Sequence, residues 1–172
     1  LVVYNKNQQS KDYSEIASYY RPGHADYTFD QKYGFRDYRG GGRSSGRETI
    51  GRVAAGAIAA KILKTLNISF TTYVSSIGDI VSDPVDFDAD YISKNELNMP
   101  DAKSYEAASA YLSDIMAQND SIGSTVKCIV SGVPAGLGDP VFDKLDANLA
   151  KALMSIGAVK AVEIGDGVMV SE

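Results

Sequence analysis

The sequence is short of several features that define whole classes of protein. Its 172 residues include one cysteine, Cys128, which excludes an internal disulfide and fits a reducing cytosol. No run of about 18 apolar residues is present, so no membrane span is predicted. No signal peptide is recognisable. We therefore expect a cytoplasmic protein that has no membrane partner.

Metal-binding and nucleotide-binding motifs are also scarce. With one histidine and one cysteine, only carboxylates remain as metal ligands, and the stretch DPVDFDAD lacks the glycine and terminal glutamate of an EF-hand loop. The string GGGRSSG lacks the Gly-Lys-Ser or Gly-Lys-Thr ending of a P-loop. The net charge of −5 disfavours nonspecific binding to nucleic acid. We predict no metal site and no nucleic-acid partner.

Arginine is missing from most of the chain and concentrated in one stretch. All six arginines and the single histidine fall between Arg21 and Arg52, where seven basic groups stand against four acidic ones. Residues 53–172 carry eight lysines against sixteen acidic residues. Because a planar guanidinium suits phosphate and carboxylate groups, this concentration predicts a site for an anion.

The predicted anion site lies at a helix start. Residues 46–66 are predicted to be helical, because apolar residues recur every three or four positions after a capping box that begins at Ser45. The free N–H groups of a helix start favour anions. Arg43 precedes this start, Arg47 lies just inside it, and Ser44 adds a hydroxyl. A solvated basic loop before an ordinary capped helix explains the same residues equally well.

The single histidine, His24, lies among these arginines in the string RPGHAD. A lone histidine is more often structural than catalytic, but its position among the arginines favours a role in the site. Asp26 could orient the imidazole, pair with an arginine or cap a turn. The seven tyrosines of the first 38 residues could stack on bases or on a flavin, or simply pack the loop.

The remaining patterns predict a mixture of strands and helices. Alternating apolar and β-branched residues predict strands at 1–4, 68–75, 126–131 and 158–164. Periodic apolar residues predict helices at 102–118 and about 140–156, and a turn of helix near Tyr91. Without strict βαβ alternation, the pattern indicates the α+β class with antiparallel strands. We expect one core domain over residues 1–172, in which 21–46 form a long active-site loop rich in arginine, glycine and tyrosine.

Three blocks of the sequence closely resemble the chorismate synthase family. In chain order they are SKDYSEI, RPGHADYTFDQKYGFRDYRGGGRSSGRETIGRVAAGAIA and GLGDPVFDKLDANLAKALMSIGAVKAVEIGDG. The strings NDSIGS and VSGVPAG depart somewhat from the family pattern. Family members are roughly twice as long, and their GESHG and RHD-type motifs are absent here. We therefore expect this chain to be the central core segment of such an enzyme.

The resemblance implies a fold, a reaction and a cofactor. The family fold is a layered β-α-β sandwich with helices packed between antiparallel sheets, assembled as a homotetramer. The implied activity is the 1,4-anti elimination of phosphate from 5-enolpyruvylshikimate 3-phosphate to give chorismate, with reduced FMN as cofactor. Because the family's other segments also supply pocket residues, we expect the 172-residue chain alone to be inactive.

The resemblance also implies roles for individual residues. Arg43, Ser44 and Ser45 match the family's flavin-binding triplet. Ser45 and Arg47 match positions close to the anionic groups of the substrate, and Arg21 is a weaker match of the same kind.

His24 matches the histidine proposed to protonate the reduced flavin or to hold its charge state. It is therefore the catalytic candidate that the resemblance supplies.

Two other functions stay open on the sequence alone. A non-catalytic anion- or nucleotide-binding module could use the same helix start and arginines without catalysing an elimination. Binding of single-stranded RNA by interleaved arginines and tyrosines is a third alternative, which the net charge of −5 opposes.

Overall fold

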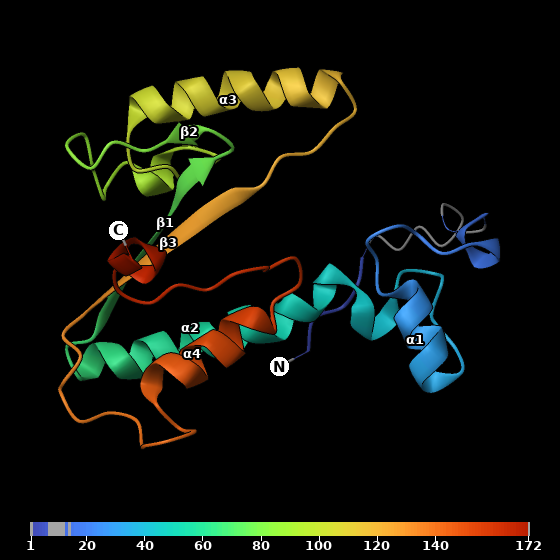
Figure 1. Cartoon of the computed structure of the whole chain (residues 1–172), viewed down its shortest axis with the longest axis horizontal. Helices are drawn as coiled ribbons and strands as arrows, with labels where there is room; N and C mark the ends of the chain where they lie inside the picture. Colours follow the sequence, from blue (N-terminus) through green and yellow to red (C-terminus); the bar gives the residue numbers. More distant parts are fainter. Residues whose placement is uncertain (1, 7–12, 14, 172) are drawn as a thin grey trace. The chain divides into compact units, whose positions relative to one another are not determined.

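The computed structural model describes residues 2–6, 13 and 15–171. The chain divides into two compact units, one formed by Leu1–Lys61 with Ala135–Glu172 and the other by Ile62–Pro134. In Figure 1 the second unit runs from green through yellow to orange. The single core domain expected over residues 1–172 stays a prediction.

A three-stranded antiparallel sheet forms the frame of the second unit, with the strand order β2-β1-β3 (Figure 1). The strands are β1 (Ser69–Ile77), β2 (Ile80–Val81) and β3 (Ser124–Ser131). β1 and β3 pair antiparallel, with a shift of register between Val74 and Ser76. The strands predicted at 68–75 and 126–131 are therefore confirmed.

Helix α3, Ala102–Ala117, supplies part of the core of this unit. Its Ala108 is buried together with Ile77 of β1 and Met99 of the preceding connector. Asp101 begins the helix, because its carboxylate accepts a backbone N–H of the first turn at 2.7 Å, as N-cap residues do. The helix predicted at 102–118 is confirmed.

The connector between β2 and α3 is held in shape by Asn95. Its amide nitrogen donates to the carbonyls of Tyr91 and Met99, both at 2.9 Å, and its Oδ1 accepts the Met99 N–H at 3.0 Å. These bonds fix Met99 in the core. The predicted turn of helix near Tyr91 is the 3₁₀ turn η5, Ile92–Lys94.

Helix α2, Thr49–Thr65, follows the 3₁₀ turn η4, Gly46–Glu48, so the helix predicted at 46–66 is confirmed. It ends before Asn67, whose φ of 59° lies in the left-handed region. Asparagine tolerates that conformation better than most residues, which makes it a natural helix stop.

The predicted capping box before α2 is half formed. Ser45 Oγ accepts the Arg47 N–H at 3.3 Å. Glu48 lies 3.3 Å from a guanidinium nitrogen of Arg43 and forms an ion pair with it. Its carboxylate is thereby engaged by a guanidinium rather than by the backbone N–H of Ser45 that a capping box would use.

Helix α4, Leu145–Met154, is shorter than the helix predicted at about 140–156. Asp139 does not act as its N-cap, because its N–H donates to the Asp143 carbonyl at 2.9 Å in an isolated β-bridge. That bridge uses backbone groups that a helix starting at residue 140 would need.

In the first unit, Arg52 of α2 donates to the carbonyl and hydroxyl of Ser155, at 3.1 and 3.0 Å.

Residues 21–46 are not a continuous loop, which corrects that expectation. They contain helix α1, Asp26–Tyr33, and the 3₁₀ turn η3, Gly42–Ser44. Asp26 places a negative charge in the first turn of α1, and Gly34, with φ of 74°, closes its last turn. These end signals outweigh the weak helix propensity of the aromatic and β-branched residues between them.

Two predicted strands do not form. Residues 2–4 and 158–164 are not in strands, and residue 1 lies outside the described part of the chain. A strand needs a partner for its backbone N–H and C=O groups, and neither segment pairs with β1, β2 or β3.

The described residues also form the short 3₁₀ turns η2 (Glu15–Ser18) and η6 (Gly167–Ser171). In the described residues, no helix is both long enough and apolar enough to cross a bilayer.

Candidate functional site

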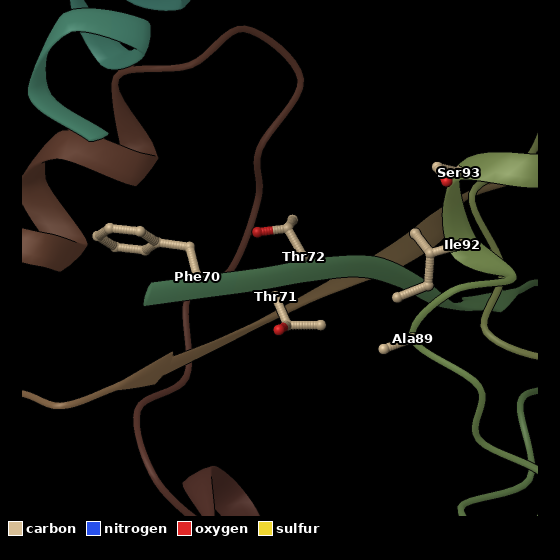
Figure 2. Close-up of a pocket in the computed structure, with 6 residues that line it drawn as sticks. All are labelled: Phe70, Thr71, Thr72, Ala89, Ile92 and Ser93. Carbon is tan, nitrogen blue, oxygen red and sulfur yellow. The ribbon is translucent and has the colours of Figure 1, made fainter. Parts of the chain in front are cut away.

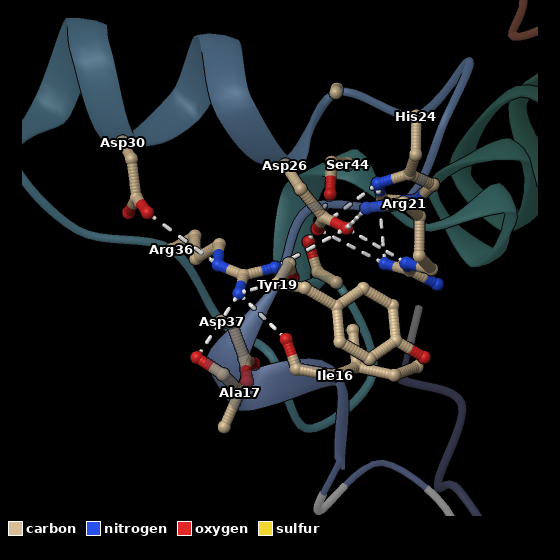
Figure 3. Close-up of polar contacts among 12 residues, drawn as sticks. Ile16, Ala17, Tyr19, Arg21, His24, Asp26, Asp30, Arg36, Asp37 and Ser44 are labelled. Carbon is tan, nitrogen blue, oxygen red and sulfur yellow. Dashed lines mark hydrogen bonds and ion pairs between the residues drawn. The ribbon is translucent and has the colours of Figure 1, made fainter.

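Asp26 is the centre of a cluster of charged side chains in the first unit (Figure 3). It is the first residue of α1, and only 1% of it is exposed. Arg21 donates two side-chain hydrogen bonds to its carboxylate, from Nε to Oδ2 at 2.8 Å and from Nη2 to Oδ1 at 3.1 Å. These bonds from Arg21 hold the pKa of the Asp26 carboxyl well below its usual range. Asp26 is therefore a buried, fixed negative charge.

His24 is attached to the same carboxylate. Its Nδ1 lies 3.0 Å from Asp26 Oδ1 and 3.2 Å from Arg21 Nη2. The tight turn at RPGHAD makes this approach possible, because the His24 N–H donates to the Arg21 carbonyl at 3.2 Å and Gly23 takes a φ of 70°. The imidazole is partly open, with 27% of the side chain exposed.

Arg36 completes the cluster and was not singled out by the sequence. It follows α1, and its Nη1 and Nε lie 3.3 Å from Asp26 and 3.5 Å from Asp30. Asp26 and Asp30 are four residues apart on α1 and so share one face of the helix. Recognition of α1 in the sequence would have placed both carboxylates together and pointed to a cation opposite them.

Arg36 also ties the segment before the RPGHAD turn to the cluster. Its Nη2 donates to the carbonyls of Ile16 and Tyr19, at 2.6 and 2.8 Å (Figure 3). The plane of its guanidinium lies 4.9 Å from the centre of the Tyr20 ring, a cation–π contact. With 9% of its side chain exposed, Arg36 is a structural clamp and not a free anion receptor.

A hollow of about 420 Å³ has Arg36 in its wall. Arg36 and Arg43 line it together with Asp37 and the Gly41-Gly42 pair. Its walls also include three aromatic side chains, those of Phe29, Tyr33 and Phe35. A volume in the range of about 300–1,000 Å³, with apolar walls and a few polar groups, is typical of small-molecule sites.

The four remaining predicted residues lie at the two 3₁₀ turns: Arg43 and Ser44 on η3, Ser45 between the turns and Arg47 on η4. Arg43 is exposed to solvent over 86% of its side chain, and its ion-pair partner among the described residues is Glu48. Ser44 Oγ donates to the Gly41 carbonyl at 2.6 Å, and Ser45 accepts from Arg47. The Arg47 side chain is exposed.

The structure therefore brings some of the predicted residues together and leaves others apart. Arg21 and His24 share one cluster. Arg43 shares the hollow with Arg36, which belongs to both. Within the described part of the chain, no hydrogen bond or ion pair joins Ser45 or Arg47 to His24.

The second unit contains a smaller hollow of about 230 Å³ (Figure 2). It is lined by Phe70, Thr71, Thr72, Ala89, Ile92 and Ser93. None of these side chains carries a charge, so this hollow lacks the groups that an anionic ligand requires. Among the residues that the structure describes, no group of three or more histidine, cysteine or acidic side chains could hold a metal ion.

Taken together, the fold and the site define an α+β protein with an aromatic-walled hollow lined by two arginines and a histidine held by a buried aspartate. Comparison with known proteins makes the class specific. A model of the chorismate synthase family matches residues 1–172. The chain belongs to the chorismate synthase family, which confirms the resemblance seen in its sequence.

The relatives support this assignment along the whole chain. Proteins named chorismate synthase are 65% identical over 97% of this chain in Agathobacter rectalis and 64% identical over 97% in Lachnospira eligens. The protein of that name in Lachnoclostridium phytofermentans is 59% identical over 100% of the chain. The chain spans 46 to 47% of the length of these relatives.

A solved structure agrees with the sequence comparison. A crystal structure of chorismate synthase matches 86% of this chain with a TM-score of 0.77 and 30% sequence identity. The chain covers 48% of that structure. The α+β fold expected from the family resemblance is therefore confirmed.

Proposed function

We propose that this chain forms part of the active centre of a chorismate synthase, a lyase that removes phosphate from 5-enolpyruvylshikimate 3-phosphate by 1,4-anti elimination. The observation that carries the proposal is the convergence of Arg21, His24 and Arg36 on the carboxylate of Asp26, together with the position of Arg36 in the wall of the hollow. The family match around the same residues supports it.

The proposed substrate carries one phosphate and two carboxylates, and the exposed guanidiniums suit these groups. Arg43 and Arg47 are positioned on consecutive turns, and Ser45 adds a hydroxyl between them. Guanidiniums that are fixed before reaction stabilise negative charge as it builds on a leaving phosphate. Arg21 serves less directly, because its guanidinium is already engaged by Asp26.

The hollow in the first unit also fits the proposed cofactor. Aromatic walls suit the flat ring system of FMN, and Arg43 with Ser44 and Ser45 provides a cation and hydroxyls for its phosphate. When bound, reduced FMN would supply electron density transiently while the phosphate leaves. The contribution of this chain would be to hold that ring and phosphate through the residues named above, while the His24 imidazole, held by Asp26, would carry a proton.

A chimera tests the proposal. Residues 1–172 of this chain would replace the matching segment of the Agathobacter rectalis relative. We expect the chimera to form chorismate from 5-enolpyruvylshikimate 3-phosphate under anaerobic conditions with reduced FMN. Arg47→Ala should lose most of the turnover, whereas Lys151→Ala, which removes an exposed cation on α4, should not. A folded chimera that gives no product would refute the proposed activity.

The chimera also separates the enzyme from a simple anion-binding module. An enzyme of this family should prefer FMN to inorganic phosphate in a fluorescence titration, whereas a module that recognises any anion should not. We further propose that the active protein is a homotetramer and that the 172-residue chain alone is inactive. Light scattering of the chimera, and an anaerobic assay of the chain alone, test these two statements.

A further inference from the structure

We propose that Asp26 is a positioning residue for His24: it holds the imidazole with a proton on Nδ1, so that Nε2 is the nitrogen that exchanges a proton in the active centre. The catalytic meaning of this inference rests on the proposed function. The protonation pattern of the ring, however, can be measured without any assay of activity.

The argument starts from the close approach of three polar atoms. Asp26 Oδ1, His24 Nδ1 and Arg21 Nη2 lie 3.0, 3.1 and 3.2 Å from one another. An unprotonated Nδ1 would direct its lone pair at a carboxylate oxygen 3.0 Å away, which is repulsive. A protonated Nδ1 donates to that oxygen instead, and Arg21 Nη2, which lies 3.2 Å from Nδ1, donates to the same oxygen. One carboxylate oxygen can accept both bonds.

The carboxylate of Asp26 is fixed in position and in charge by several groups. Arg21 donates to it twice through its side chain, and Arg36 places a further positive charge 3.3 Å from Oδ2. Asp26 is buried and stays ionised, since the bonds from Arg21 depress the pKa of its carboxyl. Among the described residues, Arg21 and Asp26 are the charged side chains within hydrogen-bond distance of the imidazole of His24, and Arg36 acts on Asp26.

The same arrangement leaves one nitrogen of the ring for chemistry. Nδ1 is engaged by Asp26, whereas no bond to Nε2 is recorded in the described part of the chain. The ring keeps 27% of its surface exposed, so a proton donor or acceptor can reach it. Fixing the second ring nitrogen through a carboxylate is a known way to select the working tautomer of a histidine.

Nuclear magnetic resonance of the chain tests the assignment directly. Because His24 is the only histidine of the sequence, its ring nitrogens can be observed without site assignment. At a pH where the ring is neutral, we expect the proton on Nδ1 and a slowly exchanging Nδ1–H signal shifted by its bond to the carboxylate. A wild-type ring with its proton on Nε2 would overturn the proposal, whatever the chimera does.

Two variants with the same change of charge sharpen the test. Asp26→Asn should shift the tautomer ratio toward Nε2–H, whereas Asp30→Asn, one turn further along α1, should leave the ratio unchanged. Circular dichroism establishes that both variants are folded. An unchanged ratio in folded Asp26→Asn would contradict a positioning role, and if that variant does not fold, the wild-type spectrum still decides.

Activity of the chimera provides a second readout. General acid–base catalysis contributes about 10²- to 10⁴-fold, so Asp26→Asn should lower kcat by on the order of 100-fold or more, with little change in KM. Asp30→Asn should keep most of the activity. An inactive parent chimera would count against the proposed function alone, while an active Asp26→Asn chimera would count against the positioning role alone.

Discussion

At neutral pH, replacement of Asp26 by asparagine should destabilise the fold of the first unit. The change removes the negative charge between Arg21 and Arg36 while it keeps the volume of the side chain. Breaking a fully buried ion pair on one side costs about 3–5 kcal/mol. Here Arg21 is 28% exposed and can turn to water, and Arg36 keeps Asp30 at 3.5 Å. We therefore expect a smaller loss, about 2–3 kcal/mol.

The loss should depend on pH with a definite sign. The pKa of Asp26 in the folded chain lies below that of the unfolded chain, because Arg21 donates to its carboxylate. Between the two pKa values the unfolded chain binds more protons, so the stability contributed by Asp26 rises with pH. It is fully present above the ordinary aspartate pKa of about 3.9 and is lost as the pH falls below it, by about 1.4 kcal/mol for each pH unit.

Urea unfolding measures this difference. The chain has no tryptophan, and seven of its eleven tyrosines lie in the first 38 residues, so tyrosine fluorescence reports mainly on the first unit. We expect the gap in unfolding free energy between wild type and Asp26→Asn to shrink between about pH 5 and pH 2. Asp30→Asn, whose carboxylate is 26% exposed, should show a smaller gap. A gap that stays constant over this range would refute the reasoning.

Three further changes have distinct expected outcomes. Met99→Ala should lower the unfolding free energy of the second unit by about 2–5 kcal/mol in urea, because Met99 is wholly buried. Met116 is exposed, so Met116→Ala should change that free energy by no more than about 0.5 kcal/mol. Gly132→Ala should lower the melting temperature, because φ is 81° there and a Cβ would clash with the Asn67 carbonyl. Arg43→Ala should weaken FMN binding in a fluorescence titration of the chimera yet change stability by no more than about 1 kcal/mol.

Elements with strong local patterns could be predicted from the sequence. α2 combines periodic apolar residues with Ser45 before it and Asn67 after it. α3 likewise follows the N-cap residue Asp101. In β1 and β3 the β-branched residues mark strands that pair over most of their lengths. For α3, β1 and β3 the local signal and the contacts of the folded chain favour the same structure.

Elements that depend on distant partners were predicted poorly. The 158–164 segment has a strand-like composition, but no described strand pairs with it. At 139–143 a β-bridge replaces the first turn of the predicted helix. For α1 the end signals were present, but glycines and arginines around it favoured a loop assignment. Composition reports propensity, whereas these outcomes depend on which backbone groups meet.

The site shows the same division between local and distant contacts. Arg21, His24 and Asp26 lie within six consecutive residues, so the sequence could suggest that they meet. Arg36 instead reaches Ile16, twenty residues earlier in the chain. No periodicity predicts that bond, because it depends on how α1 folds back on the preceding segment.

The structure also changes the meaning of the arginine cluster. Arg21 and Arg36 are committed to the buried Asp26, and Arg52 to Ser155, so these three guanidiniums are not free receptors for a ligand. Arg39, Arg43 and Arg47 are exposed, and under the proposed function Arg43 and Arg47, on η3 and η4, remain for an anion.

This division explains why so many guanidiniums occur in one stretch. A histidine that exchanges protons must be held rigidly, and a buried carboxylate that holds it needs cations of its own to stay ionised. The anionic ligand needs other cations, which must stay accessible. Under the proposed function, one set of arginines cannot meet both requirements. Arg21 and Arg36 surround Asp26, whereas Arg39, Arg43 and Arg47 are exposed, and Arg36 also lines the hollow.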